Sequence, residues 1–131
     1  MSAVNRPLAP PGLAPPAARY SHAVVSERAG RWLHTSGVVP ARPEGGVPEE
    51  LAEQAALVWE TIAVLLAEAA MTVADVVSVT TYVVAGNDLG VVMAARDRAM
   101  AGHEPASTLV LVPALARPEW RLEVSVVAAA P

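Results

Sequence analysis

One segment near the middle of the chain, residues 75–86 with the sequence DVVSVTTYVVAG, constrains the fold most tightly. It is rich in β-branched residues, and apolar side chains occupy positions that point to both faces of an extended strand. This pattern is typical of a central strand buried between other elements. We therefore predict a sheet that holds this segment in its interior.

A long amphipathic helix is predicted just before this strand, over residues 49–70. Pro48 suits the first turn of a helix, and the acidic residues that follow it favour the positive end of the helix dipole. Apolar residues then recur at steps of three and four, which places them on one face: Leu51, Ala55, Val58, Ile62, Leu65 and Ala69. The acidic residues Glu53, Glu60 and Glu68 lie away from this stripe, so one face of the helix is predicted to pack on the sheet.

The other segments complete a two-layer α+β sandwich. They are a hairpin of residues 20–27 and 31–36 that turns at Gly30, a second helix over 88–101 capped by Asn87 or Asp88 and stopped at Gly102, and strands at 106–112 and 120–129. The predicted order is β-β-α-β-α-β-β, with both helices on one face of a single sheet.

The chain length of 131 residues suits one domain, predicted over residues 18–131. Residues 1–17 form a proline-rich N-terminal arm, for which we expect an extended, polyproline-like conformation. The arm contains no continuous apolar run of the kind that a signal peptide has. No segment of the chain reaches the roughly 18–20 apolar residues of a membrane span.

The second face of the predicted sheet has no cover in this chain. Residues 76–84 and 107–112 are read as apolar on both faces, yet two helices cover only one. Hydrophobic residues make up 53% of the sequence, which agrees with an apolar face that another subunit covers. We therefore expect a homo-oligomer that assembles through the sheet.

Charge and cysteine content exclude several classes of function. The net charge is −4 and the basic residues are scattered, which disfavours a nucleic-acid surface. Without cysteine the chain has no disulfide, thiolate nucleophile or Cys-ligated metal, and this agrees with a cytoplasmic protein. Its histidines, His22, His34 and His103, are too widely spaced to indicate a metal site, so we expect no metal.

One carboxylate, Glu123, interrupts the apolar strand RLEVSVV at residues 121–127. Alternation directs Leu122, Val124 and Val126 to the helices and puts Glu123 on the opposite face, together with Arg121. Two interpretations follow from the spacing. Glu123 is either a structural ion-pair partner, with Arg121 a candidate, or a partly desolvated acid suited to proton transfer.

Several segments, in their order and spacing, resemble the Rid family of reactive-intermediate imine deaminases, also called YjgF or endoribonuclease L-PSP proteins. They are YSHAV, HTSGVVP, EQAALVWETIAVLLAEA, ADVVSVTTYVV and EPASTLVLVPALARPEWRLEVSVVA, between about residues 18 and 129. The resemblance implies a chorismate-mutase-like α+β fold. It also implies a homotrimer with small-molecule clefts between subunits, which agrees with the sheet face left uncovered.

By this resemblance, Glu123 is the catalytic residue that positions or activates the attacking water. The family's carboxylate-binding arginine is replaced by Ser107, which cannot make the same two-pronged contact. The other substrate-binding positions are Tyr20, Ser36, Gly37, Val38 and Met93. Of these, Val38 replaces a usual glutamine and Met93 stands near a usual asparagine, so the cleft is more apolar than is typical.

The expected activity is therefore hydrolysis of an imine or enamine other than the usual 2-imino acids, without a cofactor. The alternative is a non-catalytic trimer that binds a small ligand in the same clefts. Chorismate mutase activity is disfavoured because its dianionic substrate needs arginine at the strand position that Ser107 occupies. Ribonuclease activity fits poorly with the acidic charge balance.

Overall fold

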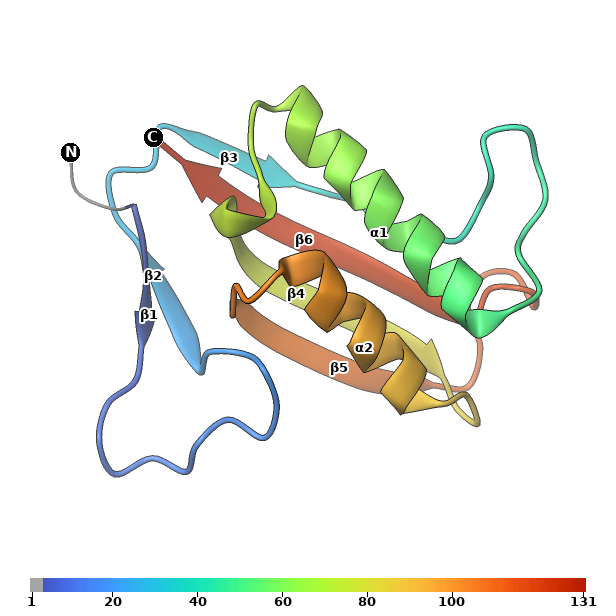
Figure 1. The fold of residues 1–131 in the computed structure, drawn as a ribbon, viewed down its shortest axis with the longest axis horizontal. Coiled ribbons are helices and arrows are strands. Elements are labelled where there is room, and N and C mark those ends of the chain that lie inside the picture. Colours follow the sequence, from blue (N-terminus) through green and yellow to red (C-terminus); the bar gives the residue numbers. More distant parts are fainter. Residues whose placement is uncertain (1–3) are drawn as a thin grey trace.

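The computed structural model describes residues 4–131, which form the elements shown in Figure 1. In chain order these are β1 (Asn5–Leu8), β2 (Ala23–Ser26), β3 (Arg31–His34), α1 (Leu51–Glu68), the short 3-10 helix η1 (Val73–Asp75), β4 (Val76–Val84), α2 (Leu89–Met100), β5 (Ala106–Val112) and β6 (Leu122–Ala130). Both α-helices lie on one face of the main sheet, which makes a two-layer α+β sandwich (Figure 1). This is the predicted fold class.

The main sheet has four strands in the order β3-β6-β4-β5. β4 and β5 run parallel, joined by α2, whereas β6 lies antiparallel to both β3 and β4. The predicted central strand, β4, is thus flanked on both sides. It is most deeply buried at the alternate residues Val79, Thr81 and Val83, which face the helices.

Both predicted helices form. α1 buries Ala55, Val58, Ile62 and Leu66 against the sheet, whereas Leu65, predicted for the same stripe, is 39% exposed. In the last turns, the residue that packs on the sheet is therefore Leu66 and not Leu65. A helix has 3.6 residues per turn, and the predicted steps of three and four placed the stripe one residue too early there. In α2, Asp88 is the N-cap and accepts a hydrogen bond from the backbone N–H of Gly90 at 2.9 Å.

The predicted N-terminal hairpin is wrong, and so is part of the predicted polyproline arm. β2 pairs with β1, in a register that sets Asn5 against Ser26, and β3 pairs with β6 instead. The amide of Asn5 also donates to the carbonyl of Ala129 at 3.0 Å. Residues 5–8 therefore belong to a strand that is tied to the end of the main sheet, and the predicted strand order gains one strand at its start.

The sheet face without helices is more polar than predicted. The residues of β4 and β6 that point to it include Ser78, Thr80, Tyr82, Glu123 and Ser125, all half-buried. The near-continuous β-branched run hid this alternation, because threonine counts as a β-branched residue yet carries a hydroxyl group. In the described part of the chain, no helix is both long and apolar enough to cross a membrane.

Candidate functional site

Glu123 lies on the helix-free face of β6, between two residues that are fully buried on the other face, Leu122 and Val124. Its neighbour across the strand pair is Tyr82 of β4. A Cβ atom added to Gly37 would lie 1.9 Å from Oε2 of Glu123, so the carboxylate rests directly on the backbone of Gly37. Among the described residues, none makes a hydrogen bond or an ion pair with this carboxylate.

The segment after β3 is tied to β6 at this point. Val38 donates from its N–H to the carbonyl of Val124 at 2.7 Å and accepts from the N–H of Val124 at 3.0 Å. This isolated bridge sets the backbone of Ser36 and Gly37 beside Glu123. The structure therefore places Gly37, with its neighbour Ser36, against Glu123, and we call these three residues the Glu123 cluster. The side chain of Val38, a predicted site residue, pairs with Val124 and is buried in the core on the helix-facing side, so it does not share the face of Glu123.

The start of β6 is positioned by Gln54 of α1, which is almost completely buried. Its amide nitrogen donates to the carbonyls of Pro48 and Glu119, each at 2.9 Å, and its amide oxygen accepts from the N–H of Arg121 at 3.0 Å. The guanidinium of Arg121 donates to the carbonyl of Glu49. Arg121 is therefore not the ion-pair partner of Glu123 that the spacing allowed.

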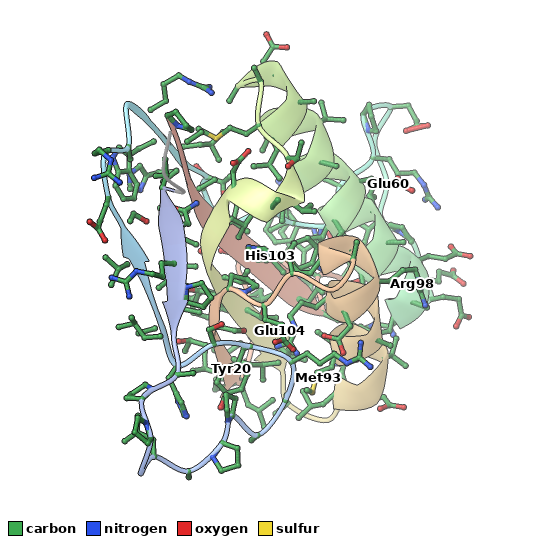
Figure 2. All side chains as sticks on the ribbon, turned by 60° about the vertical axis from the view of Figure 1, so that its left-hand side comes forward. Tyr20, Glu60, Met93, Arg98, His103 and Glu104 are labelled. Carbon is green, nitrogen blue, oxygen red and sulfur yellow. The ribbon has the colours of Figure 1, made fainter. Side chains whose placement is uncertain are left out.

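Ser107 lies near the start of β5, at the outer edge of the sheet. The segment before β2 runs along this edge, because Ser21 forms a parallel bridge with Ala106 and donates from its N–H to the carbonyl of Pro105 at 3.0 Å. Tyr20 is therefore close in sequence to a residue that touches β5. Figure 2 shows Tyr20 and Met93, a residue of α2, in the same half of the molecule.

The hydroxyl of Ser107 accepts a hydrogen bond from Nη1 of Arg96 at 3.2 Å. Arg96 projects from α2, and among the described residues it is the only charged one that is buried. Its Nη2 also forms an ion pair with Oδ1 of Asp97 at 3.1 Å. We call these three residues the Ser107 cluster.

A single chain does not bring the two clusters together. Ser107 pairs with Val79, and Val79 pairs with Val126, so Ser107 shares the helix-facing side of the sheet with both. Glu123 precedes Val126 by three residues in β6, so its side chain points to the opposite side of the sheet. A site that uses both Ser107 and Glu123 requires a second copy of the chain.

Three residues near these clusters were missed by sequence reasoning: Gln54, Arg96 and Asp97. A signal existed for two of them. Gln54 stands next to Ala55 in the apolar stripe of α1, and Arg96 stands four residues after Val92 and four before Met100, both buried. A polar residue inside an apolar helical stripe needs partners, which is a reason to look for a buried network.

Other features of the surface lie apart from the predicted site. A pocket of about 300 Å³ separates α1 from α2 and is lined by Trp59, Ile62 and Val73 among others. Glu60 and Arg98, which also line it, stand on the side away from the N-terminal strands (Figure 2). The described residues contain no group of three or more metal-ligating side chains that could hold a metal ion.

The sequence matches the family model for endoribonuclease L-PSP over residues 12–130. This span covers most of the chain. The protein belongs to the endoribonuclease L-PSP family, also called the Rid or YjgF family, which its sequence segments resemble. A search of curated proteins found no match.

Solved structures of this family superimpose closely on the chain. YyfB from Yersinia pestis, described as a Rid family protein of unknown function, is 30% identical with a TM-score of 0.86 over 98% of this chain and 100% of its own. Escherichia coli YjgF is 27% identical with a TM-score of 0.71 over 88% of this chain and 91% of its own. Escherichia coli TdcF, solved with bound serine, shares the fold at 22% identity, with a TM-score of 0.71 over 88% of this chain and 91% of its own.

Family membership supports a role in processing or binding small molecules. It also supports the assignment of the fold as chorismate-mutase-like. The individual site residues rest on their geometry in this chain and on the sequence resemblance.

Proposed function

We propose that this Rid family member is a hydrolase of uncharged imines or enamines, acting in a cleft between subunits of a homotrimer. The observation that carries the proposal is the carboxylate of Glu123, which rests on Gly37 and has no hydrogen-bond or ion-pair partner among the described residues. A carboxylate held in place but left unpaired has its lone pairs available for a water molecule.

In the proposed reaction, water adds to the carbon of the C=N bond while Glu123 accepts one of its protons. Glu123 passes this proton to the imine nitrogen, which gives a neutral carbinolamine. The hydroxyl proton of the carbinolamine then moves to the nitrogen as the C–N bond breaks, so the nitrogen leaves as ammonia or an amine and the carbon becomes a carbonyl group. An enamine enters the same sequence after tautomerising to its imine, and no cofactor is needed.

The rest of the proposed cleft comes from the other predicted positions. Ser107 faces the helix layer and bonds to Arg96 of α2, the helix that also carries Met93, whereas Gly37 contacts Glu123 on the other face of the sheet. We propose that one subunit contributes the Glu123 cluster and its neighbour contributes the residues around Ser107. The lack of cysteine agrees with a cytoplasmic location, which stays a prediction.

The trimer is tested by light scattering coupled to gel filtration. We expect three chains per particle, and we expect Trp32→Glu to weaken the assembly, because Trp32 is exposed on the helix-free face and stacks on His34. Val64→Glu is the matched control, since Val64 is exposed on the outer side of α1. A wild-type protein that stays monomeric at micromolar concentration contradicts the shared cleft.

The activity is tested with N-benzylidenemethylamine, an uncharged imine whose hydrolysis is followed by absorbance after subtraction of the spontaneous rate. We expect wild type to accelerate it and Glu123→Gln, which keeps the size but removes the base, to lose about two to four powers of ten. An equal rate for the two proteins removes Glu123 from the mechanism.

A second candidate is a trimer that binds a small ligand without transforming it. The structure of TdcF with bound serine favours this reading, since it shows a ligand in a protein of the same fold. The two candidates differ in the imine assay. Binding of the imine without acceleration by wild type supports the second.

A further inference from the structure

Arg96 is a charged residue placed where α2 packs on the sheet. Its exposure is only 6%, and the buried residues Val92 and Met100 stand one turn before and one turn after it. An arginine keeps its charge at all physiological pH values. Its burial therefore requires groups that compensate the charge.

Those groups are Asp97 and Ser107. Nε and Nη2 of Arg96 donate to the same oxygen, Oδ1 of Asp97, at 3.3 and 3.1 Å, and Nη1 donates to Oγ of Ser107 at 3.2 Å. Consecutive residues of a helix point in different directions, so Asp97 reaches its neighbour from the side. The contact engages one carboxylate oxygen, which leaves Oδ2 outside this ion pair.

The two charges of the pair are unequally exposed. The side chain of Arg96 is 7% exposed and that of Asp97 is 31% exposed. The carboxylate of Asp97 is therefore the more solvent-accessible charge of the pair, and the guanidinium that contacts Ser107 is the less accessible one. A second carboxylate at this place is repelled by Asp97, and the positive charge that would attract it is already neutralised.

The pair lies beside predicted site residues. Met93 precedes Arg96 by three positions and Asp97 by four, so it shares their side of α2. Ser107 bonds directly to Arg96 and is the residue that replaces arginine in the sequence resemblance. The charges of Arg96 and Asp97 therefore act on the part of a ligand that contacts Ser107.

We infer that the Arg96–Asp97 pair determines specificity at Ser107: Asp97 occupies Arg96 as an internal carboxylate, so the site accepts ligands whose end at Ser107 is uncharged and rejects carboxylates. The inference rests on the proposed function for the location of the site. It deepens that function by naming the substrate class and the residues that select it.

The test compares two ligands of equal shape, butanamide and butanoate, by NMR titration of ¹⁵N-labelled protein. In wild type we expect butanamide to shift the amide signals around Ser107 and to bind at least as tightly as butanoate. Tighter binding of butanoate at Ser107 by wild type overturns the inference, and this measurement needs no variant.

Asp97→Asn removes the internal carboxylate and leaves the guanidinium of Arg96 without a charged partner. We expect this variant to bind butanoate at least ten times more tightly than wild type does. Glu68→Gln makes the same change of charge at an exposed position of α1 and should leave butanoate affinity unchanged. The double variant Asp97→Asn with Arg96→Gln should lose the gain, and a gain that persists in it contradicts the role of Arg96.

The outcomes separate this inference from the proposed function. If Asp97→Asn gains butanoate binding while no protein hydrolyses an imine, the specificity element stands and the hydrolase proposal fails. If wild type hydrolyses the uncharged imine while Asp97→Asn and Glu68→Gln bind butanoate equally weakly, the hydrolase proposal stands and the specificity element fails.

Discussion

The carboxylate of Glu123 lies where a side chain on Gly37 would have to be, since a Cβ atom there would approach Oε2 to 1.9 Å and Cδ to 2.5 Å. The φ angle of Gly37 is not positive, so the requirement for glycine is one of space and not of backbone conformation. Glu123 lies in β6 and Gly37 lies in the segment after β3. Their contact therefore fixes the position of the Glu123 carboxylate relative to that segment.

Gly37→Ala should therefore displace the carboxylate of Glu123 while leaving the fold intact. The atoms in the way are the far end of a flexible side chain, which can rotate, so we expect a loss in the free energy of unfolding of about 1 kcal/mol or less. Any imine hydrolysis should fall nearly as far as in Glu123→Gln. Adding Gly37→Ala to Glu123→Gln should then change the rate little, and a large further loss contradicts the proposed link.

Gln54→Leu tests how β6 is held in place. The change keeps a similar size but leaves three backbone groups, of Pro48, Glu119 and Arg121, without their partner; the hydrogen bond to Pro48 is buried and the other two are partly buried. We expect the free energy of unfolding to fall by roughly 3 kcal/mol, measured by urea denaturation. Glu53→Leu, at the exposed neighbouring position, is the control and should stay within about 0.5 kcal/mol.

The N-terminal strand gives a further prediction, contrary to what the proline content suggests. Asn5→Ala removes the hydrogen bond to the carbonyl of Ala129 and leaves the hydroxyl of Ser26 without its acceptor, so we expect a loss of about 1–2 kcal/mol. Arg6→Ala breaks only an exposed ion pair with Glu27 and should cost less than about 1 kcal/mol. Equal thermal stability of the two variants shows that β1 contributes little.

The sequence predicted the structure well wherever a single hydrophobic periodicity, helical or strand-like, dominated a segment. The helical stripe of α1, the central position of β4 and the burial of Leu122 and Val124 beneath Glu123 all follow from local alternation, which the structure confirms. The boundaries shifted by only a few residues because helix ends are marked by residues such as Asp88.

Pairing between distant segments was harder to predict. β1 joins β2 across the proline-rich connection, and nothing in a four-residue strand with the sequence NRPL identifies its partner. The same holds for Arg96 and Ser107, which meet because α2 folds back onto the strand that follows it. Local patterns predict which residues are buried. The partners of a buried polar residue, however, depend on the whole fold.

Ser107→Arg is the last prediction, and it depends on Arg96. The new guanidinium would enter a partly buried place where Nη1 of Arg96 already stands 3.2 Å from the hydroxyl of Ser107, so crowding and like charge should cost about 1–3 kcal/mol. Ala67→Arg is the control, because Ala67 is exposed on α1 and lies away from both β5 and the helix-free face of the sheet.

Arg96→Met should restore the stability lost in Ser107→Arg, since methionine fills the space without a charge. Hydrolysis of 2-iminobutanoate should then rise, by up to one or two powers of ten if the new guanidinium binds the carboxylate. The measurements are thermal melting and ammonia release, corrected for spontaneous hydrolysis, on the single and double variants. A Ser107→Arg protein that gains this activity at unchanged melting temperature shows instead that Arg96 moves aside, and that the two guanidinium groups do not compete for one place.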